Sequence, residues 1–308
     1  MKRNKLQNYA EYYGLKVLIF IICLLRRHAA HALGTIIALI MYYFIPVRKK
    51  ETLKNISLSF PEKSEKEVKL IAKNTYKNFV KILIDMVFIS KMSDKEIEKL
   101  LIFDEDIIKK AFNKGKGLVL LSAHFGNWEL SALAFSKKYP VALIIAKQSN
   151  SFIDNMISNF RMKEGFNIIG FQRDDKISFR GVMKALKKNH ILAILGDQDA
   201  GAQGVFLPFF GRLASTPKGP AFFAIHAGSP IITAFGVVQK DGSMKMEIEE
   251  LEIPNTGNEE KDIEIINTIY NQRLEAVIRK NPEQWFWFHR RWNTRPGKKY
   301  KKRFDKQT

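Results

Sequence analysis

A histidine and a glutamate lie five positions apart in the stretch LSAHFGNWEL, residues 121–130. On one continuous helix, two such positions would point roughly 140° away from each other. The residues before the pair form an apolar run typical of a buried strand, and Trp128 begins a helical pattern, so we expect a turn between them with Asn127 as the helix N-cap. His124 would then lie in the loop and Glu129 in the first helical turn. This geometry can fold the glutamate back onto the imidazole and leave the other ring nitrogen free to take a proton from a hydroxyl.

The same pair also has an interpretation without catalysis. A loop histidine often makes only structural hydrogen bonds, and Glu129 in a first helical turn would stabilise the helix dipole. From His124 and Glu129 by themselves, both interpretations stay open.

Two further carboxylates, Asp197 and Asp199, follow the apolar strand expected at Ile191–Leu195. At the carboxyl end of a strand they can bind a metal, orient His124 or a cationic side chain, or cap a turn. No histidine or third carboxylate lies close enough in sequence to favour a metal. We therefore expect both aspartates to serve a substrate site, and we expect neither a metal nor another cofactor.

Three arginines are candidates for substrate binding. Arg290 and Arg291 stand among tryptophan and phenylalanine residues, and a planar guanidinium beside aromatic rings suits bidentate phosphate binding at a membrane boundary. Arg161 lies on a helix expected at 152–163, where a solvated charge is the more usual interpretation. Ser122 has no G-x-S-x-G elbow around it, so a covalent serine mechanism is not expected.

Composition limits the class of protein. A chain of 308 residues with 46% hydrophobic content can build a packed core. Its 51 basic and 31 acidic residues give a formal charge of +20, which indicates a polyanionic partner: nucleic acid, an anionic membrane surface or an acidic protein. The single cysteine, Cys23, lies in an apolar run, which excludes internal disulfides and a cysteine-rich metal site.

The N-terminal part of the chain holds two apolar runs flanked by basic residues. Val17–Leu25 is too short to span a bilayer, and Ala29–Ile45 is near the lower edge of the roughly 17–25 residues needed. The pattern favours a pair of helices that enters one anionic leaflet, although a cleaved signal peptide and two ordinary core helices stay open as alternatives. We expect residues 1–50 to form a membrane-anchoring helical segment and residues 51–308 to form the main domain.

Strands and helices alternate through the rest of the chain. Strands are expected at Gly117–Leu121, Val141–Ile145, Ile191–Leu195, Pro230–Gly236 and Met244–Ile253. Helices are expected at 64–87, from Ser93 onwards, and at Trp128–Lys138, Phe152–Lys163, Ile177–Lys188 and Asp262–Lys280. The pattern predicts a single α/β domain with a mixed, partly parallel central sheet flanked by helices, to which N-terminal membrane-associated helices are added. Its functional loops should lie at the carboxyl ends of the strands, where His124 is expected.

Five sequence blocks occur in a fixed order: HFGNWE at 124–129, GDQD at 196–199, FLPFFG at 206–211, STPKGP at 215–220 and PEQWFWFHRRWNTRP at 282–296. Together with NISLSFP at 55–61, they resemble the bacterial lipid A secondary acyltransferases. This family is the lauroyl/myristoyl transferase branch of the lysophospholipid acyltransferase superfamily. The resemblance covers nearly the whole chain.

The resemblance implies transfer of a fatty acyl chain from acyl carrier protein, or from acyl-CoA, to a hydroxyl of a phosphorylated lipid A precursor. The enzyme would work at the cytoplasmic face of the inner membrane, with residues 51–308 as its catalytic domain. His124 and Glu129 match the family's paired histidine and acid, so His124 would be the general base, Glu129 would stabilise the imidazolium, and no acyl-enzyme would form. Substrate contacts are expected from Asn127, Arg161, Asp197, Asp199, Arg290 and Arg291.

Two other functions stay open. The acceptor can be a different glycolipid or a lysophospholipid, and the chain can be a basic membrane-binding protein without catalysis. Nucleic acid is not expected as a partner, because the basic residues are spread along the chain and concentrate beside the apolar runs.

Overall fold

The computed structural model describes residues 5–297 apart from 46, 90, 146–147 and 171–177. The basic tail that the sequence shows from Arg295 to Arg303 therefore lies largely outside the described residues, as does the expected start of a helix at 177. The strands are β1 Leu101–Ile102, β2 Leu118–Ser122, β3 Val141–Ile145, β4 Asn167–Gly170, β5 Ile191–Leu195, β6 Val205–Phe209, β7 Arg212–Thr216, β8 Ile231–Val238 and β9 Met244–Leu251.

The helices of the main domain alternate with these strands. They are α3 Lys49–Ser59, α4 Glu65–Ile89, α5 Asp94–Leu100, α6 Glu105–Phe112, α7 Trp128–Ser136, α8 Ser151–Lys163, α9 Phe179–Lys187, α10 Gly219–Ala227 and α11 Glu259–Lys280, with short 3-10 turns η1 Gly201–Gln203 and η2 Pro282–Gln284. The predicted strands and helices that the structure describes agree with these bounds to within three residues. The sequence patterns did not indicate β1, β4, the β6–β7 pair, α3, α6 or α10, which are short or lack a clear period.

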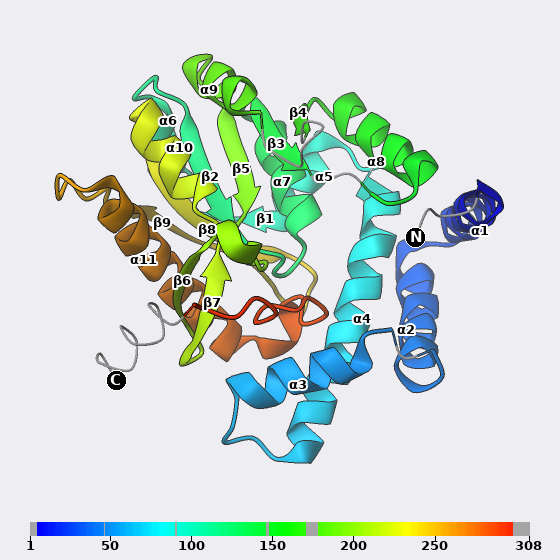
Figure 1. Cartoon of the computed structure of the whole chain (residues 1–308). Helices are drawn as coiled ribbons and strands as arrows, with labels where there is room; N and C mark the ends of the chain where they lie inside the picture. Colours follow the sequence, from blue (N-terminus) through cyan, green and yellow to red (C-terminus); the bar gives the residue numbers. More distant parts are fainter. Residues whose placement is uncertain (1–4, 46, 90, 146–147, 171–177, 298–308) are drawn as a thin grey trace.

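The predicted mixed, partly parallel sheet is confirmed. Seven strands follow the order β1-β9-β8-β2-β5-β3-β4, and only the β8–β9 pair is antiparallel within it (Figure 1). β6 and β7 form a separate antiparallel hairpin. β2 lies between β8 and β5, so the loop that follows it opens at the middle of the sheet.

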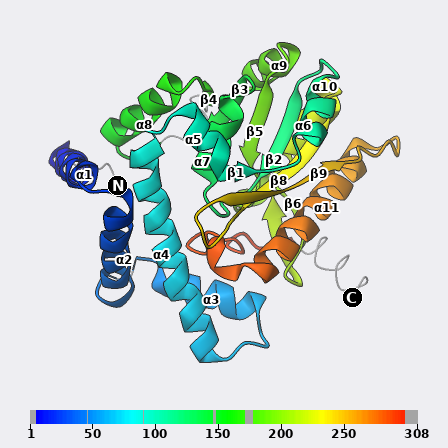
Figure 2. The ribbon, with the colours of Figure 1, turned by 180° about the vertical axis from the view of Figure 1, so that it is seen from behind.

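Helices cover both faces of the sheet, and the central strand β2 is buried along most of its length. Val119 and Leu121 pack in one apolar cluster with α9, α10 and α11, whereas Leu118 and Leu120 pack in another with α5, α6 and α7 (Figures 1 and 2). A strand enclosed on both faces is expected to be an unbroken apolar run, which is what its sequence shows.

Two N-terminal helices, α1 Lys5–Leu24 and α2 Arg27–Tyr43, lie beside α4 on the side of the molecule away from α11 (Figures 1 and 2). Small residues line the buried stripe of α2, and a Cβ added at Gly34 would come within 2.3 Å of Ile84 on α4. Glycine at this position therefore permits the close contact of the two helices.

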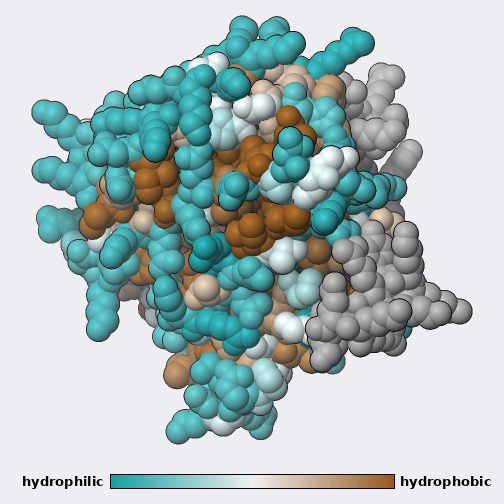
Figure 3. All heavy atoms as spheres, turned by 90° about the vertical axis from the view of Figure 1, so that its left-hand side faces the viewer, coloured by the Kyte–Doolittle hydropathy of each residue, from teal (hydrophilic) through white to brown (hydrophobic). Residues whose placement is uncertain are grey.

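Large hydrophobic side chains remain exposed on α1, on α2 and just after it. They include Leu6, Tyr13, Val17, Phe20, Leu24, Ile36, Tyr43, Phe44 and Ile45. The face on the α9–α11 side, by contrast, carries mostly hydrophilic residues, with hydrophobic surface gathered near its centre (Figure 3). Within the described ranges, no helix combines the length and the apolar character that a membrane crossing needs.

Candidate active site

His124 and Asp197 meet at the carboxyl edge of the sheet. β2 and β5 are parallel neighbours, with Ser122 opposite Leu195 in the register, and each functional residue lies two positions beyond that pair. Asp197 Oδ1 accepts a hydrogen bond from His124 Nδ1 at 2.8 Å, and Asp197 Oδ2 accepts one from the His124 backbone N–H at 3.0 Å. The ring and the carboxylate are therefore fixed relative to each other by two bonds.

Asp197 is only 2% exposed, and a third hydrogen bond holds it, from Trp285 Nε1 to Oδ2 at 2.8 Å. Burial by itself would raise the pKa of the Asp197 carboxyl, but the charge of His124 and the hydrogen bonds from His124 and Trp285 outweigh burial and lower the pKa below its ordinary value. An ionised carboxylate only accepts hydrogen bonds, so Nδ1 of His124 carries a proton. Nε2 is then the ring nitrogen that can receive a proton from a bound hydroxyl.

The C-terminal aromatic segment encloses this pair. The Phe286 N–H donates to the His124 carbonyl at 3.0 Å, and the Gly126 N–H donates to the Gln284 carbonyl at 2.9 Å. A Cβ at Gly126, whose φ is +56°, would lie 1.8 Å from the Gly236 carbonyl oxygen, so the close approach of these chains requires glycine. Sequence reasoning missed the roles of Trp285 and Phe286, although the unusual run of aromatic residues was a usable signal.

Glu129 pairs with Arg161 rather than with the histidine. Arg161 Nη2 on α8 donates to Glu129 Oε1 at 2.5 Å, and the two side chains are 15% and 16% exposed. We expected Glu129 to bond to His124, and the structure differs. The first turn of α7 directs Glu129 towards Arg161 on α8, and the ring of His124 bonds instead to Asp197, which follows β5. The buried Nε of Arg161 has no hydrogen-bond partner among the described residues.

A cavity of about 550 Å³ adjoins these groups. His124, Glu129 and Arg161 contribute its principal polar side chains, with Ser122, Gln148 and Gln198. The remaining lining is largely apolar and includes Leu120, Trp128, Phe135, Leu143, Ile144, Ala193, Ile194, Phe223, Ala234 and Met246. A largely apolar space thus adjoins an imidazole whose Nε2 can accept a proton.

Asn127 caps α7, as the sequence predicted. Its Oδ1 accepts from the Leu130 N–H at 3.1 Å, and its Nδ2 donates to Asp85 Oδ2 at 3.2 Å. The side chain is buried and does not line the apolar cavity. It positions the helix that carries Glu129, and its expected contact with substrate stays a prediction.

Asp199 lies near the pair but does not line the cavity. Its backbone N–H donates to His289 Nε2 at 3.1 Å, and its Oδ2 accepts from Thr294 Oγ1 at 2.7 Å. Burial, with nearby positive charge, lowers the pKa of His289 to about 4, so this ring is neutral and accepts the bond. Across the part of the chain that the structure describes, no group of three or more His, Cys, Asp or Glu could hold a metal.

The two neighbouring arginines have different surroundings. Arg291 is completely buried: one terminal nitrogen donates to the Ser215 carbonyl and the other to Thr216 Oγ1 at 2.8 Å, and burial lowers its pKa to about 10. Arg291 thereby holds the β6–β7 hairpin, which differs from the accessible phosphate ligand that we expected. Arg290 is exposed, and neither arginine lines the cavity.

Comparison with known proteins gives a consistent result. A family model described as bacterial lipid A biosynthesis acyltransferase matches residues 1–294. The chain is 27% identical over 270 residues to the lipid A biosynthesis palmitoleoyltransferase of Escherichia coli K12, covering 86% of this chain and 85% of the relative. It is 26% identical over 256 residues to the lipid A biosynthesis lauroyltransferase of the same strain, covering 82% and 81%. The phosphatidylinositol mannoside acyltransferase of Mycolicibacterium smegmatis is 24% identical over 197 residues, or 63% of each chain.

Proposed function

The chain belongs to the bacterial lipid A biosynthesis acyltransferase family, and from this premise we propose that it transfers a fatty acyl chain from a thioester to a hydroxyl of a phosphorylated lipid A precursor. The thioester donor is acyl carrier protein or acyl-CoA. One observation carries the proposal: the His124 ring, fixed by the buried Asp197, lines an apolar cavity of about 550 Å³. A proton acceptor beside a space for an alkyl chain is what acyl transfer to an alcohol needs.

The reaction proceeds in two steps without an acyl-enzyme. His124 Nε2 takes the proton of the acceptor hydroxyl while the oxygen attacks the thioester carbonyl, and a tetrahedral oxyanion forms. Collapse of this intermediate breaks the carbon–sulfur bond, and the imidazolium returns its proton to the departing thiolate. The products are the ester and the free thiol, so charge and protons balance without a cofactor.

Asp197, and not Glu129 as the sequence suggested, is the carboxylate that supports His124. It keeps the proton of His124 on Nδ1 and stabilises the imidazolium that forms when Nε2 is protonated. Because Asp197 is buried and its lowered pKa keeps it ionised near neutral pH, its charge is present throughout the reaction.

The Glu129–Arg161 pair serves the substrate. Glu129 holds the guanidinium of Arg161 at the cavity, where its positive charge attracts an oxygen of the bound substrate. The N-terminal amides of α7 are candidates to stabilise the thioester oxyanion, since a helix N-terminus favours negative charge. Exposed Arg290 is the candidate ligand for an acceptor phosphate, and Arg290→Glu should raise the acceptor KM more than the donor KM.

The enzyme acts at the cytoplasmic face of the inner membrane, anchored by residues 1–50. This part of the proposal is supported by the exposed hydrophobic side chains on α1 and α2 and by the basic residues that flank them. The net charge of +20 complements both an acidic carrier protein and a phosphorylated lipid.

The test uses the full chain in membranes with radiolabelled acyl carrier protein thioesters and a lipid A precursor. His124→Ala should lower transfer by on the order of 10²–10⁴-fold, because the general base is lost. His226→Ala is the matched control, since His226 is an exposed histidine on α10 outside the cavity. Near-full transfer by the His124→Ala protein would refute the proposed mechanism.

A second acceptor class follows from one comparison. A phosphatidylinositol mannoside acyltransferase is among the relatives, so a mannosylated glycolipid belongs in the same assay, together with a lysophospholipid. Label in the lipid A precursor with wild-type protein supports the main proposal. Label in the mannoside or the lysophospholipid with none in the lipid A precursor would transfer the proposal to that acceptor.

A further inference from the structure

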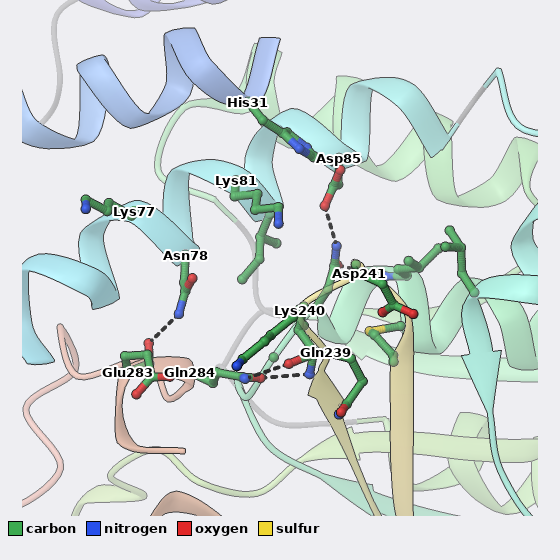
Figure 4. A pocket seen from close by; sticks show the side chains of 18 of the residues that line it. His31, Lys77, Asn78, Lys81, Asp85, Gln239, Lys240, Asp241, Glu283 and Gln284 are labelled. Carbon is green, nitrogen blue, oxygen red and sulfur yellow. Dashed lines mark hydrogen bonds and ion pairs between the residues drawn. The ribbon is translucent and has the colours of Figure 1, made fainter. Parts of the chain in front are cut away.

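A second cavity, of about 610 Å³, lies on the other side of the first turn of α7. Asn127 and Leu130 line this cavity, whereas Trp128, Glu129 and Ser131 line the apolar one. Its other walls come from α2, α4, η2 and the turn between β8 and β9 (Figure 4). Nothing in the acyl-transfer mechanism uses this space.

Charged side chains dominate its lining. Arg27 is already paired: its guanidinium donates to Asp85 at 3.0 Å, and His31 Nε2 lies 2.8 Å from the same carboxylate. The other charged lining residues are Lys77, Lys81, Lys240, Asp241 and Glu283. Among the described residues, no ion pair within 4 Å neutralises any of these three lysines, and Asp241 accepts hydrogen bonds from Ser243 inside its own turn.

Two of the lysines stand one helical turn apart on α4. Lys77 and Lys81 are half-buried and share their helix face with Asn74 and Asn78. Like charges at this spacing destabilise a helix. An anion bound between this face and the opposite wall would offset that repulsion.

The opposite wall supplies the third lysine. Lys81 extends from α4 and Lys240 from the β8–β9 turn into the same space, while Lys77 lies nearer its edge (Figure 4). Hydrogen bonds fix the walls: Gln284 bonds to both the N–H and the carbonyl of Val238, and Asn78 donates to the Glu283 carbonyl at 2.9 Å. The space is therefore formed before a ligand arrives, which reduces the entropy lost on binding.

We infer that this cavity is a binding site for a phosphate-ester anion, held by Lys77, Lys81 and Lys240. Separate ammonium groups on two walls suit a group with several charged oxygens better than a single carboxylate, and lysine binds phosphate as a point charge. A membrane phospholipid headgroup is one source, because Leu24, 71% exposed at the end of α1, lies three residues before Arg27 on the cavity wall. A soluble phosphate ester is the other source. The inference concerns binding and does not depend on acyl transfer.

The experiment measures binding of radiolabelled inorganic phosphate to the full chain in neutral detergent. Lys77→Gln/Lys81→Gln should weaken phosphate binding at least about tenfold, and Lys240→Gln, on the other wall, should weaken it by about two- to fivefold. Lys66→Gln/Lys73→Gln is the matched control, because it removes the same charge from the same helix outside the cavity; it should change binding less than twofold, on the order of a screening effect. The thermal midpoint of the Lys77→Gln/Lys81→Gln protein without phosphate should equal or exceed that of wild type, which separates lost binding from unfolding.

Competition with vesicles and with a soluble ester then shows whether the bound anion is a lipid headgroup or a soluble phosphate ester. Phosphatidylcholine vesicles that contain phosphatidylglycerol should displace phosphate from wild type if the ligand is a lipid headgroup, whereas pure phosphatidylcholine should not. Displacement by glycerol 3-phosphate but not by either vesicle assigns the site to a soluble ester. Equal phosphate binding by wild type and Lys77→Gln/Lys81→Gln, or equal losses in the pocket and control variants, would overturn the inference.

Discussion

Two buried aspartates, Asp197 and Asp85, lie on either side of α7. Each bonds to a histidine, but their other neighbours differ. Asp197 bonds to His124 and Asp85 bonds to His31, each with a distance of 2.8 Å. In both carboxyls, burial would raise the pKa, and partners outweigh burial so that the pKa is lowered. A histidine–aspartate pair alone therefore does not distinguish a catalytic site from a structural one.

The surroundings separate the two pairs. Asp85 also accepts two hydrogen bonds from the guanidinium of Arg27, so its charge is balanced without its histidine. Asp197 has Trp285 as its other side-chain partner, a neutral donor, and its histidine lines an apolar cavity. Among the described residues, His124 is thus the one titratable side chain that hydrogen-bonds to Asp197, and its ring also has a space for a substrate beside it.

The largest expected difference between the two pairs appears when each aspartate is neutralised in turn. Asp197→Asn should lower acyl transfer by on the order of 10²–10⁴-fold, because the ring loses its tautomer and the imidazolium its counter-charge. Asp85→Asn should lower it by less than about tenfold, since the ion pair and hydrogen bonds that it weakens lie outside the apolar cavity. Transfer rates with acyl carrier protein thioester measure both, and equal losses would show that the two pairs act alike.

Filling the apolar cavity should change which acyl chain is used. Ala193 on β5 is half-buried and lines the cavity, so Ala193→Leu places added methyl groups where we propose that the acyl chain binds. Exclusion of two or three methylenes at about 0.8 kcal/mol each should lower kcat/KM for long relative to short chains about 10–100-fold. Competing thioesters of different length measure the ratio. Ala202→Leu on the exposed η1 turn is the control, and an unchanged ratio in Ala193→Leu would place the acyl chain elsewhere.

A double-mutant cycle decides the partner of Glu129. Glu129→Gln and Arg161→Gln should show a coupling on the order of 1–3 kcal/mol in transition-state free energy, because each change leaves the other charge half-buried and unpaired. The cycle of Glu129→Gln with His124→Ala should show less. Coupling confined to the histidine cycle would restore the His124–Glu129 pairing that the sequence suggested.

The smallest effect concerns stability in acid. Asp85→Asn should lower the unfolding free energy near neutral pH by on the order of 1–2 kcal/mol, a reduced figure because the Arg27 side chain is 35% exposed. Since the folded pKa of Asp85 is depressed, its contribution is present above the unfolded pKa of about 4 and is lost as pH falls through the folded value. Urea unfolding between neutral pH and pH about 2 should therefore show a shallower acid loss in the variant than in wild type. Parallel pH profiles would exclude Asp85 as a contributor.

Much of the local structure was predictable from the sequence. The apolar runs of β2, β3 and β5 are uninterrupted because both sheet faces are covered, and the N-cap at Asn127 follows from a polar residue placed before a helical pattern. The position of His124 past the end of β2 followed from the same boundaries. Short elements such as β1 and the β6–β7 hairpin did not, since a few residues carry too little periodicity.

The local sequence was enough to place His124 in the loop after β2, to place the acidic residues after β5, and to identify the family. Long-range packing places β5 beside β2, so that His124 bonds to the carboxylate of Asp197 and Glu129 pairs with Arg161. The same packing buries Arg291 against the β6–β7 hairpin and leaves Arg290 exposed. The physical reason is that periodicity and capping report on residues within a few positions of each other. Strand order and side-chain pairing depend on contacts between residues far apart in sequence, such as the 73 positions that separate His124 from Asp197.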